Sequence, residues 1–339
     1  MSLPERVGFL RAKVEEALRS FLEPREPSLL YQMICYHLGW EDLQGRPVPG
    51  GAGKAIRPVL CLLACEAAGG LWRQALPAAM ALELVHNFSL VHDDIQDQDV
   101  ERRHRPTVWA IWGQAQAINA GDALLALAQR ALALLPQAGV SAEKAVEAAT
   151  VLAEATLEMV EGQVTDLIFE QMENVTEAAY MDMVGRKTGA LIGAALHLGA
   201  LCAHSPSDLC RQMGRAGRLL GIAFQVKDDV LGIWGIEAQT GKPSGSDILR
   251  RKKTLPIILA LEAGGKFRET IVSAYSRPDG EAVARVLATL DEIEARSRCL
   301  AIAHHALQEA LAILGSLPLQ EEPAQELKAV AHFLIERNY

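Results

Sequence analysis

The chain is poor in the residues that build sheets, disulfide frameworks and nucleic-acid surfaces. Aromatic side chains make up 5% of its 339 residues, and alternating Val, Ile and Thr runs punctuated by turns are missing, so few strands are expected. Its six cysteines include no Cys-x-x-Cys pair and lie mostly in apolar stretches, which indicates reduced thiols in a cytoplasmic protein. The net charge of −9 argues against nucleic-acid binding.

The sequence also lacks a signal peptide and an apolar run long enough to cross a bilayer, so we expect no integral membrane segment. It contains instead long patterns with the 3.6-residue period of amphipathic helices, and half of its residues are apolar. Helices are predicted over residues 4–22, 28–40, 54–69, 74–92, 115–135, 142–171, 177–203, 207–234, 254–263, 266–276, 279–315 and 321–337. Because no shift of composition marks a linker, we predict one all-α domain over residues 1–339.

Two acidic clusters interrupt these apolar helices: Asp93, Asp94 and Asp97 in one, Asp228 and Asp229 in the other. Asp93 and Asp97 are four residues apart and therefore lie on one helical face. Both clusters fall toward the C-terminal side of their helices, where the helix dipole disfavours negative charge, so a cation is expected beside them. Hard oxygen ligands presented in this way suit Mg²⁺, which completes its shell with water and substrate phosphate oxygens.

Basic residues follow each acidic cluster along the chain. Arg102, Arg103 and Arg105 follow the first, and Lys242 with the quartet at 250–253 follows the second. A glycine-rich stretch, Gly50 to Lys54, enters a helix that carries Arg57, an arrangement that can cradle an anion but is not a Walker A motif. His86 lies two turns before Asp93, either as an ordinary core histidine or as a phosphate contact. At both sites the acidic residues are followed by basic ones. This order predicts a layered site in which carboxylates contact Mg²⁺, Mg²⁺ contacts a diphosphate, and Arg or Lys contacts the diphosphate from its other side.

The residues resemble those of the trans-isoprenyl diphosphate synthases, the polyprenyl synthetase family. Six matching motifs occur in the family's order: Gly53-Lys54-Ala55-Ile56-Arg57-Pro58, His86 through Asp97 with Arg102-Arg103, Lys187-Thr188-Gly189, Phe224-Gln225-Val226-Lys227-Asp228-Asp229, Thr240-Gly241-Lys242-Pro243, and Lys252-Lys253-Thr254-Leu255-Pro256. The resemblance covers nearly the whole chain. It implies an all-α helical bundle of the isoprenoid synthase type, with the two acidic segments facing a central cavity, and a homodimer.

The resemblance also implies a role for each matched residue. Asp93, Asp97 and Asp228 would bind three Mg²⁺ ions with the diphosphate of an allylic substrate, while Asp94 and Asp229 would support them. The allylic diphosphate would be bound by Arg102, Lys187, Thr188, Gln225, Lys242 and Lys252. The diphosphate of isopentenyl diphosphate would be bound by Lys54, Arg57, His86 and Arg103. Head-to-tail condensation of the two substrates would give a short-chain trans-prenyl diphosphate.

Two features leave the reaction's outcome open. The family's second acidic motif usually ends in aspartate at its fifth position, where this chain has Gly232, although we expect activity to survive. The resemblance implies that Phe88 and Ser89, five and four residues before Asp93, form the floor of the product cavity. This pair favours geranylgeranyl diphosphate as the product over farnesyl diphosphate. A class I terpene cyclase would not need the second basic set, and a non-catalytic subunit would be expected to lose aspartates. The chain has this basic set and retains five aspartates in its two acidic clusters, so both alternatives are less favoured.

Overall fold

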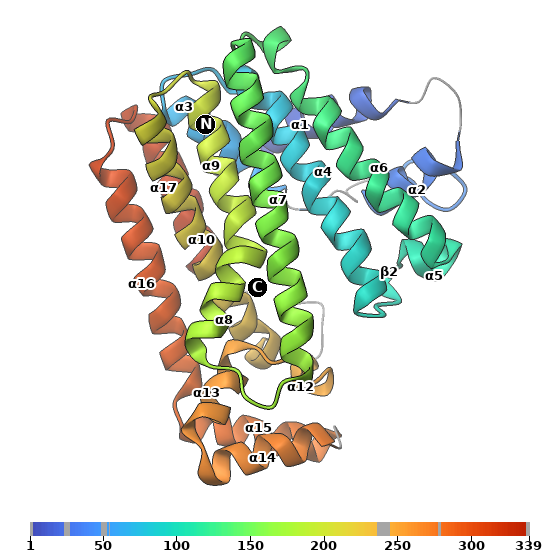
Figure 1. Ribbon diagram of the computed structural model, residues 1–339, viewed down its shortest axis with the longest axis vertical. Helices are drawn as coiled ribbons and strands as arrows, with labels where there is room; N and C mark the ends of the chain where they lie inside the picture. Colours follow the sequence, from blue (N-terminus) through green and yellow to red (C-terminus); the bar gives the residue numbers. More distant parts are fainter. Residues whose placement is uncertain are drawn as a thin grey trace. The chain divides into compact units, whose positions relative to one another are not determined.

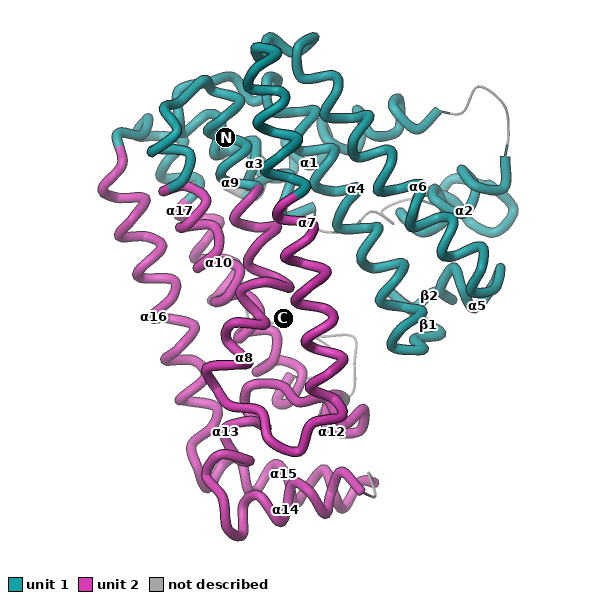
Figure 2. The backbone as a smooth tube through the Cα atoms, in the orientation of Figure 1, with its two compact units in different colours: residues 1–153, 195–211, 318–327 teal, residues 154–194, 212–317, 328–339 magenta. Residues whose placement is uncertain are grey.

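The computed structural model describes residues 3–23, 28–48, 53, 55–235, 245–276 and 279–336. These residues form an almost entirely helical structure and divide into two compact units (Figures 1 and 2). Unit 1 comprises residues 1–153, 195–211 and 318–327, and unit 2 comprises residues 154–194, 212–317 and 328–339. The all-α prediction is confirmed; the assignment of residues 1–339 to a single domain stays a prediction.

Unit 1 is built around α4, which packs most extensively against α3 and α6 (Figure 1). Its elements are α1 (Leu3–Leu22), α2 (Leu29–His37), α3 (Ile56–Ala67), α4 (Trp72–Gln96), β1 (Glu101–Arg102), β2 (Arg105–Pro106), α5 (Val108–Trp112), α6 (Gln114–Leu132) and the 3₁₀-helix η1 (Leu135–Ala138). The buried face of α4 includes Leu82, Leu84 and Val85, each fully inaccessible to solvent. This apolar packing fixes the helix that carries the first acidic cluster.

Unit 2 has its own apolar core around the end of α10 and the helices that follow. Its elements are α8 (Glu177–Val184), the π-helical turn η2 (Gly185–Gly189), α12 (Ser246–Leu249), α13 (Leu255–Ala263), α14 (Gly265–Ser276), α15 (Gly280–Glu292) and α16 (Ala295–Ser316). Ile233 of α10 packs with Ile248, Ile257 and Val286 in one buried cluster. Four helices are divided between the units: α7 (Ala142–Gln171), α9 (Ala190–Cys202), α10 (Ser207–Trp234) and α17 (Glu321–Glu336).

Two of the predicted helices are interrupted in the structure. The predicted helix 177–203 is interrupted by the π-helical turn η2, and the predicted helix 279–315 ends at Glu292 and restarts at Ala295. Glu294 at this break has a left-handed backbone with φ of 54°. Residues 98–112, between the predicted helices 74–92 and 115–135, contain the β1–β2 hairpin and α5. Among the helices of the described residues, none combines the length and the apolar composition needed to span a membrane.

Candidate active site

The first acidic cluster lies in the last turn of α4. Asp97 caps the helix, and its backbone N–H donates to the Asp93 carbonyl at 2.8 Å, so the two residues are one turn apart as predicted. Both side chains are partly exposed to solvent. Because the C-terminal end of a helix carries partial negative charge, these two carboxylates favour a cation at this position.

Asp94 points in a different direction, into the protein. Its side chain is 2% exposed, and its Oδ1 accepts a hydrogen bond from Arg102 Nε at 2.7 Å and forms an ion pair with Arg102 Nη2, also at 2.7 Å. Burial raises the pKa of Asp94 to about 6, although the Arg102 charge opposes that rise. Asp94 therefore supports the cluster by holding Arg102.

Arg103 is presented at the tip of the β1–β2 hairpin. Arg103 and His104 have left-handed φ values of 52° and 60°, the backbone that a two-residue hairpin turn requires at both central positions. The guanidinium of Arg103 lies against the backbone of Gly53, since a Cβ at Gly53 would be 2.8 Å from Nη2. Gly53, the described residue of the glycine-rich stretch, and the arginine hairpin are thus brought together.

Four further side chains gather around His86. Burial lowers the pKa of His86 well below its ordinary value, and the charges of Arg57, Arg103 and Arg102 lower it further, followed by His37. The imidazole is accordingly neutral among cations. His37 and the three hairpin arginines, Arg102, Arg103 and Arg105, line a cavity of about 280 Å³. Of the predicted basic set, Arg103 lines this cavity, and Arg57 and Arg103 both lie close enough to His86 to lower its pKa, while the predicted Lys54 lies outside the described residues.

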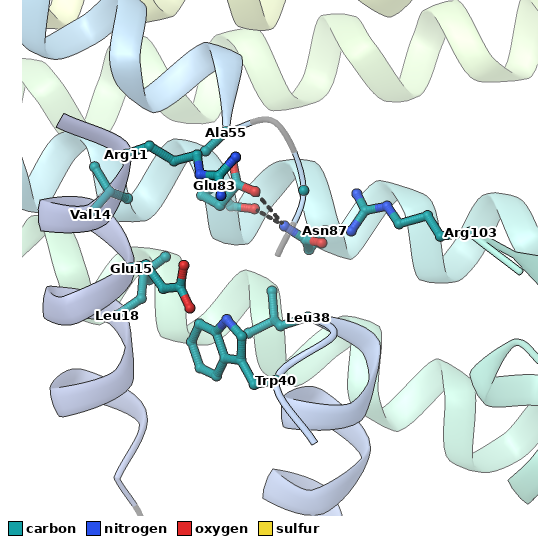
Figure 3. A pocket seen from close by; sticks show the side chains of 11 residues that line it. Arg11, Val14, Glu15, Leu18, Leu38, Trp40, Ala55, Glu83, Asn87 and Arg103 are labelled. Atoms are coloured by element: carbon teal, nitrogen blue, oxygen red, sulfur yellow. Dashed lines mark hydrogen bonds between the residues drawn. The ribbon is translucent and has the colours of Figure 1, made fainter. Parts of the chain in front are cut away.

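Glu83 was not predicted to belong to this basic set. It lies on α4, one turn before His86, and Figure 3 shows it with Asn87 opposite Arg103. Asn87 donates from Nδ2 to the Glu83 carbonyl at 2.8 Å and to Oε1 at 3.2 Å. Burial raises the pKa of Glu83, whereas Arg57 acts to lower it. Glu83 is thus a negative counterpart to these basic side chains. Its position in an apolar helix, three residues before His86, was the sequence signal that could have identified it.

Phe88 and Ser89, the predicted floor residues, follow on the same helix. Phe88 is buried, and its ring packs edge-on against His92 with centroids 4.9 Å apart. His92 in turn fills the space over Gly121 of α6, where a Cβ would be 2.2 Å from Nε2. Ser89 donates its hydroxyl hydrogen to the His86 carbonyl at 2.9 Å. The helix-to-helix contact through Gly121 therefore fixes the ring of Phe88.

The second acidic cluster lies near the end of α10 in unit 2. Asp229 is 2% exposed and accepts three hydrogen bonds: from Tyr180 Oη at 2.5 Å, Gln225 Nε2 at 3.0 Å and the Leu255 N–H at 3.1 Å. Burial nevertheless raises the pKa of Asp229 to about 7. Asp228, the predicted metal ligand, is partly exposed. Asp229 therefore holds the side chains of Tyr180 and Gln225 in place, whereas the Asp228 side chain is partly exposed to solvent.

Lys187 and Thr188 stand on the π-helical turn η2, which the sequence did not predict. Gly162 of α7 admits this turn, because a Cβ there would be 2.4 Å from the Lys187 nitrogen. Lys187 forms an ion pair with Asp166 at 2.5 Å, and Thr188 donates to Gln225 Oε1 at 2.9 Å. Single π-helical turns occur often at functional sites because they re-aim side chains. Here the turn joins Thr188, Gln225 and Asp229 in one hydrogen-bonded chain.

The remaining predicted lysines are only partly described. Lys252 is half-buried, and its carbonyl accepts from Tyr275 Oη at 2.7 Å. Lys242 lies outside the described residues. Asp166 and Tyr180, the partners of Lys187 and Asp229, were missed because sequence spacing does not reveal contacts between distant helices.

The donor atoms fit Mg²⁺ bound together with a diphosphate. Across the described residues, no three His, Cys, Asp or Glu side chains form a ready-made metal cage. Mg²⁺ is ordinarily held by one or two carboxylates together with water and substrate phosphates, so a dedicated cage is not needed. Asp93 and Asp97 in unit 1 and Asp228 in unit 2 offer that kind of oxygen donor.

The helical fold and the two acidic clusters with their neighbouring basic side chains are those of an all-α enzyme of the prenyltransferase class. Comparisons with known proteins give the same class. The model of the family described as polyprenyl synthetase matches residues 48–293. The (2E,6E)-farnesyl diphosphate synthase of Mycobacterium tuberculosis (strain ATCC 25618 / H37Rv) is 39% identical over 98% of this chain and 92% of its own length. The geranylgeranyl diphosphate synthase of the same organism is 42% identical over 77% of this chain and 73% of its own.

A solved structure shows the same fold. The polyprenyl synthetase from Streptomyces coelicolor A3(2) superposes with a TM-score of 0.91 at 34% identity, covering 98% of this chain and 100% of that one. The chain belongs to the polyprenyl synthetase family. The predicted family, fold and enzyme class are thereby confirmed.

Proposed function

We propose that the protein condenses isopentenyl diphosphate with an allylic diphosphate head to tail, in the presence of Mg²⁺, to give a short-chain trans-prenyl diphosphate. The observation that carries this proposal is the basic set of unit 1, in which Arg103 lies against Gly53 and, together with Arg57, is close enough to His86 to lower the pKa of its imidazole. The set lies on and beside the helix that bears Asp93 and Asp97. An enzyme that only ionises an allylic diphosphate does not need this second anion site.

Within this proposal the two diphosphates are bound by different residues. Arg57, His86, Arg103 and Lys54 bind isopentenyl diphosphate. Asp93, Asp97 and Asp228 hold Mg²⁺, three ions being expected with the allylic diphosphate bound. The allylic diphosphate itself contacts Arg102, Lys187, Thr188, Gln225, Lys242 and Lys252. Asp94 and Asp229 act through Arg102 and Gln225, which they hold by hydrogen bonds.

The chemistry assigned to the chain's residues is electrostatic. Bound Mg²⁺ would supply positive charge to the departing allylic diphosphate. Arg102 and Lys187 add positive charge on the same leaving group, which favours breakage of the allylic C–O bond. Apolar side chains such as Phe88 exclude water from the resulting carbocation, so that the isopentenyl double bond captures it. The departing diphosphate takes the proton that is lost, and no side chain of the described residues is assigned as the base.

We further propose geranylgeranyl diphosphate as the product, with farnesyl diphosphate as the alternative. Phe88 supports this choice, because its ring is buried and packs against His92, which itself lies against Gly121 of α6. Phe88→Ala would remove part of the floor and lengthen the product by at least one isopentenyl unit, measured by sizing the dephosphorylated alcohols. An unchanged product distribution would contradict the role given to Phe88.

Synthesis by purified protein tests the proposal as a whole. The protein would be incubated with Mg²⁺, isopentenyl diphosphate and dimethylallyl, geranyl or farnesyl diphosphate in turn. We expect elongation that EDTA abolishes, with a twenty-carbon alcohol predominating. Cyclic hydrocarbon without elongation, or no turnover of any primer, would refute the proposal. We also propose that the enzyme works as a homodimer in the cytoplasm; its six free cysteines support a reducing compartment.

A further inference from the structure

Arg105, the third arginine of the β1–β2 hairpin, is assigned no substrate contact in the proposed function. The register of the hairpin places it directly opposite Arg102, so two positive side chains are paired across the strands. Like charges in opposing positions destabilise a pair of strands, so each of them needs a partner elsewhere. The two arginines contact different parts of unit 1.

Arg102 is bound to α4 through Asp94, whose Oδ1 lies 2.7 Å from Arg102 Nε. Arg105 is bound instead to α2 and to the residues that follow this helix. Its guanidinium carbon lies 4.0 Å from the centroid of the Tyr36 ring, and its Nη2 donates to the Glu41 carbonyl at 2.6 Å. A guanidinium on the face of a tyrosine ring gains cation–π attraction, to which its planar shape is well suited.

Tyr36 is itself fixed in place by its neighbours. It is 5% exposed, and its ring packs edge-on against Trp112 of α5 with the centroids 5.3 Å apart. Its Oη donates to the Pro106 carbonyl at 2.9 Å. Tyr36 therefore contacts β2 twice, through the side chain of Arg105 and through the backbone of Pro106. In this way α2 holds β2, as α4 holds β1.

The two anchors together determine where the turn between the strands lies. Arg103 occupies this turn, and its guanidinium lies against Gly53. Arg103 is also close enough to His86 to lower the pKa of that imidazole. Because Arg103 projects from a turn, tilting of either strand would move its guanidinium relative to both neighbours. Loss of the Arg105 contacts would loosen β2 from α2 while β1 stays bound to α4.

We propose that Arg105 is a positioning residue, which holds the hairpin so that Arg103 meets the diphosphate of isopentenyl diphosphate. It acts through its contacts with the Tyr36 ring and the Glu41 carbonyl. This inference rests on the proposed function, which assigns that diphosphate to Arg103. Arg105 also lines the cavity of about 280 Å³ beside Arg102 and Arg103. Direct contact between Arg105 and the diphosphate is therefore the competing explanation.

Three variants and a control separate the two explanations. Arg105→Met removes the charge and keeps an unbranched side chain, whereas Tyr36→Leu removes the ring on which the guanidinium stacks. The third variant combines both changes. Arg130→Met is the control, because the exposed Arg130 of α6 has its guanidinium carbon 5.1 Å from the centroid of the Phe21 ring. The same change is thus made at another contact between a cation and a ring.

Three quantities are measured for each protein. The first is the affinity for isopentenyl diphosphate, by calorimetry without a primer. The second is the set of steady-state constants, namely kcat and the KM of each substrate. The third is hydrogen–deuterium exchange of the backbone amides in residues 99–107, which reports whether the hairpin is loosened.

Arg105→Met and Tyr36→Leu are each expected to raise the Kd and the KM for isopentenyl diphosphate about tenfold, since a displaced binding group costs affinity. The KM for the allylic diphosphate and kcat should stay near their wild-type values, because the contact between Arg102 and Asp94 remains. Exchange in the hairpin should be faster in both variants. The combined variant should be no worse than either single one, because both changes break the same contact. Arg130→Met should match the wild type.

Two results would overturn the proposal. One is wild-type exchange, or a wild-type KM for isopentenyl diphosphate, in Arg105→Met. The other is a combined variant that loses about a hundredfold, the product of the two single losses. Independent effects of that kind would mean that Arg105 acts on the substrate without Tyr36.

Tyr36→Phe keeps the ring face and separates the stacking from the hydroxyl contact. It is expected to bind isopentenyl diphosphate nearly as well as the wild type, and a loss equal to that of Arg105→Met would contradict the proposal. This pair of variants decides the question if Tyr36→Leu does not fold. Failure of the proposed function would appear separately, as wild-type protein that elongates no primer. Hydrogen exchange and the affinity for inorganic pyrophosphate would then test the anchoring of the hairpin by themselves.

Discussion

At the scale of single residues, the site depends on buried charges held by specific partners. Asp94 relies on Arg102, Asp229 on Tyr180, Gln225 and the Leu255 N–H, and Glu83 on Asn87. The sequence predicted the aspartates and most of the cationic residues, because their spacing matches a known pattern. It did not predict Glu83, Tyr180 or Asp166, since burial and contacts between distant segments leave no periodic signal.

Arg102→Ala is expected to lower the free energy of unfolding by about 2 kcal/mol, because it leaves the buried Asp94 carboxylate without its guanidinium. The partly exposed Arg102 side chain keeps this below the loss typical of a fully buried pair. Denaturation with urea measures the change. Adding Asp94→Asn to Arg102→Ala should recover part of it, and a purely additive double variant would contradict the coupling.

His37 gives a prediction for the dependence of stability on pH. Burial lowers the pKa of His37 to about 3, against an ordinary value near 6.5. The unfolded chain therefore binds a proton between these values that the folded chain excludes, so stability is present above pH 6.5 and is lost as the pH falls toward 3. The free energy of unfolding of the wild type relative to His37→Gln should fall by about 1.4 kcal/mol per pH unit below pH 6. Parallel stability curves for the two proteins would contradict a His37 imidazole that is neutral in the folded protein.

At the scale of elements, periodicity predicted the helices well and their interruptions poorly. The helices over residues 142–171 and 207–234 were predicted almost to the residue, because long apolar stripes define them. The π-helical turn at Gly185–Gly189 was missed, since Lys187 and Thr188 continue a plausible helical pattern. The break at Glu294 was missed for a similar reason: its left-handed backbone is not signalled by a glycine.

Gly162→Ala is expected to disturb the π-helical turn and the placement of Lys187. The added methyl would be 2.4 Å from the Lys187 nitrogen, so α7 and the turn must separate. Overpacking of this kind destabilises proteins by about 1–3 kcal/mol, and we also expect a higher KM for the allylic diphosphate. Gly8→Ala, at an open helical position, is the matched control and should be neutral or slightly stabilising. An equal effect of the two substitutions on stability would contradict the close approach.

At the scale of the whole molecule, each of the two compact units carries one acidic cluster with its own basic side chains. Unit 1 holds Asp93 and Asp97 with Arg57, His86 and Arg103, and unit 2 holds Asp228 with Lys187. The order of six motifs in the sequence was enough to predict the family, which the comparisons confirm. Product length was not determined by that order, since relatives of similar identity are named for different products. The role of packing around Phe88 in setting it is our proposal.

We propose that the basic group around Arg57 and the basic group around Lys187 bind different diphosphates, and steady-state kinetics of one variant in each group tests this assignment. Arg57→Ala is predicted to raise the KM for isopentenyl diphosphate about tenfold or more while leaving the KM for the allylic diphosphate near the wild-type value. Lys187→Ala is predicted to do the reverse. If both substitutions raise the KM for the same substrate, or neither raises any, the assignment of the two groups is wrong.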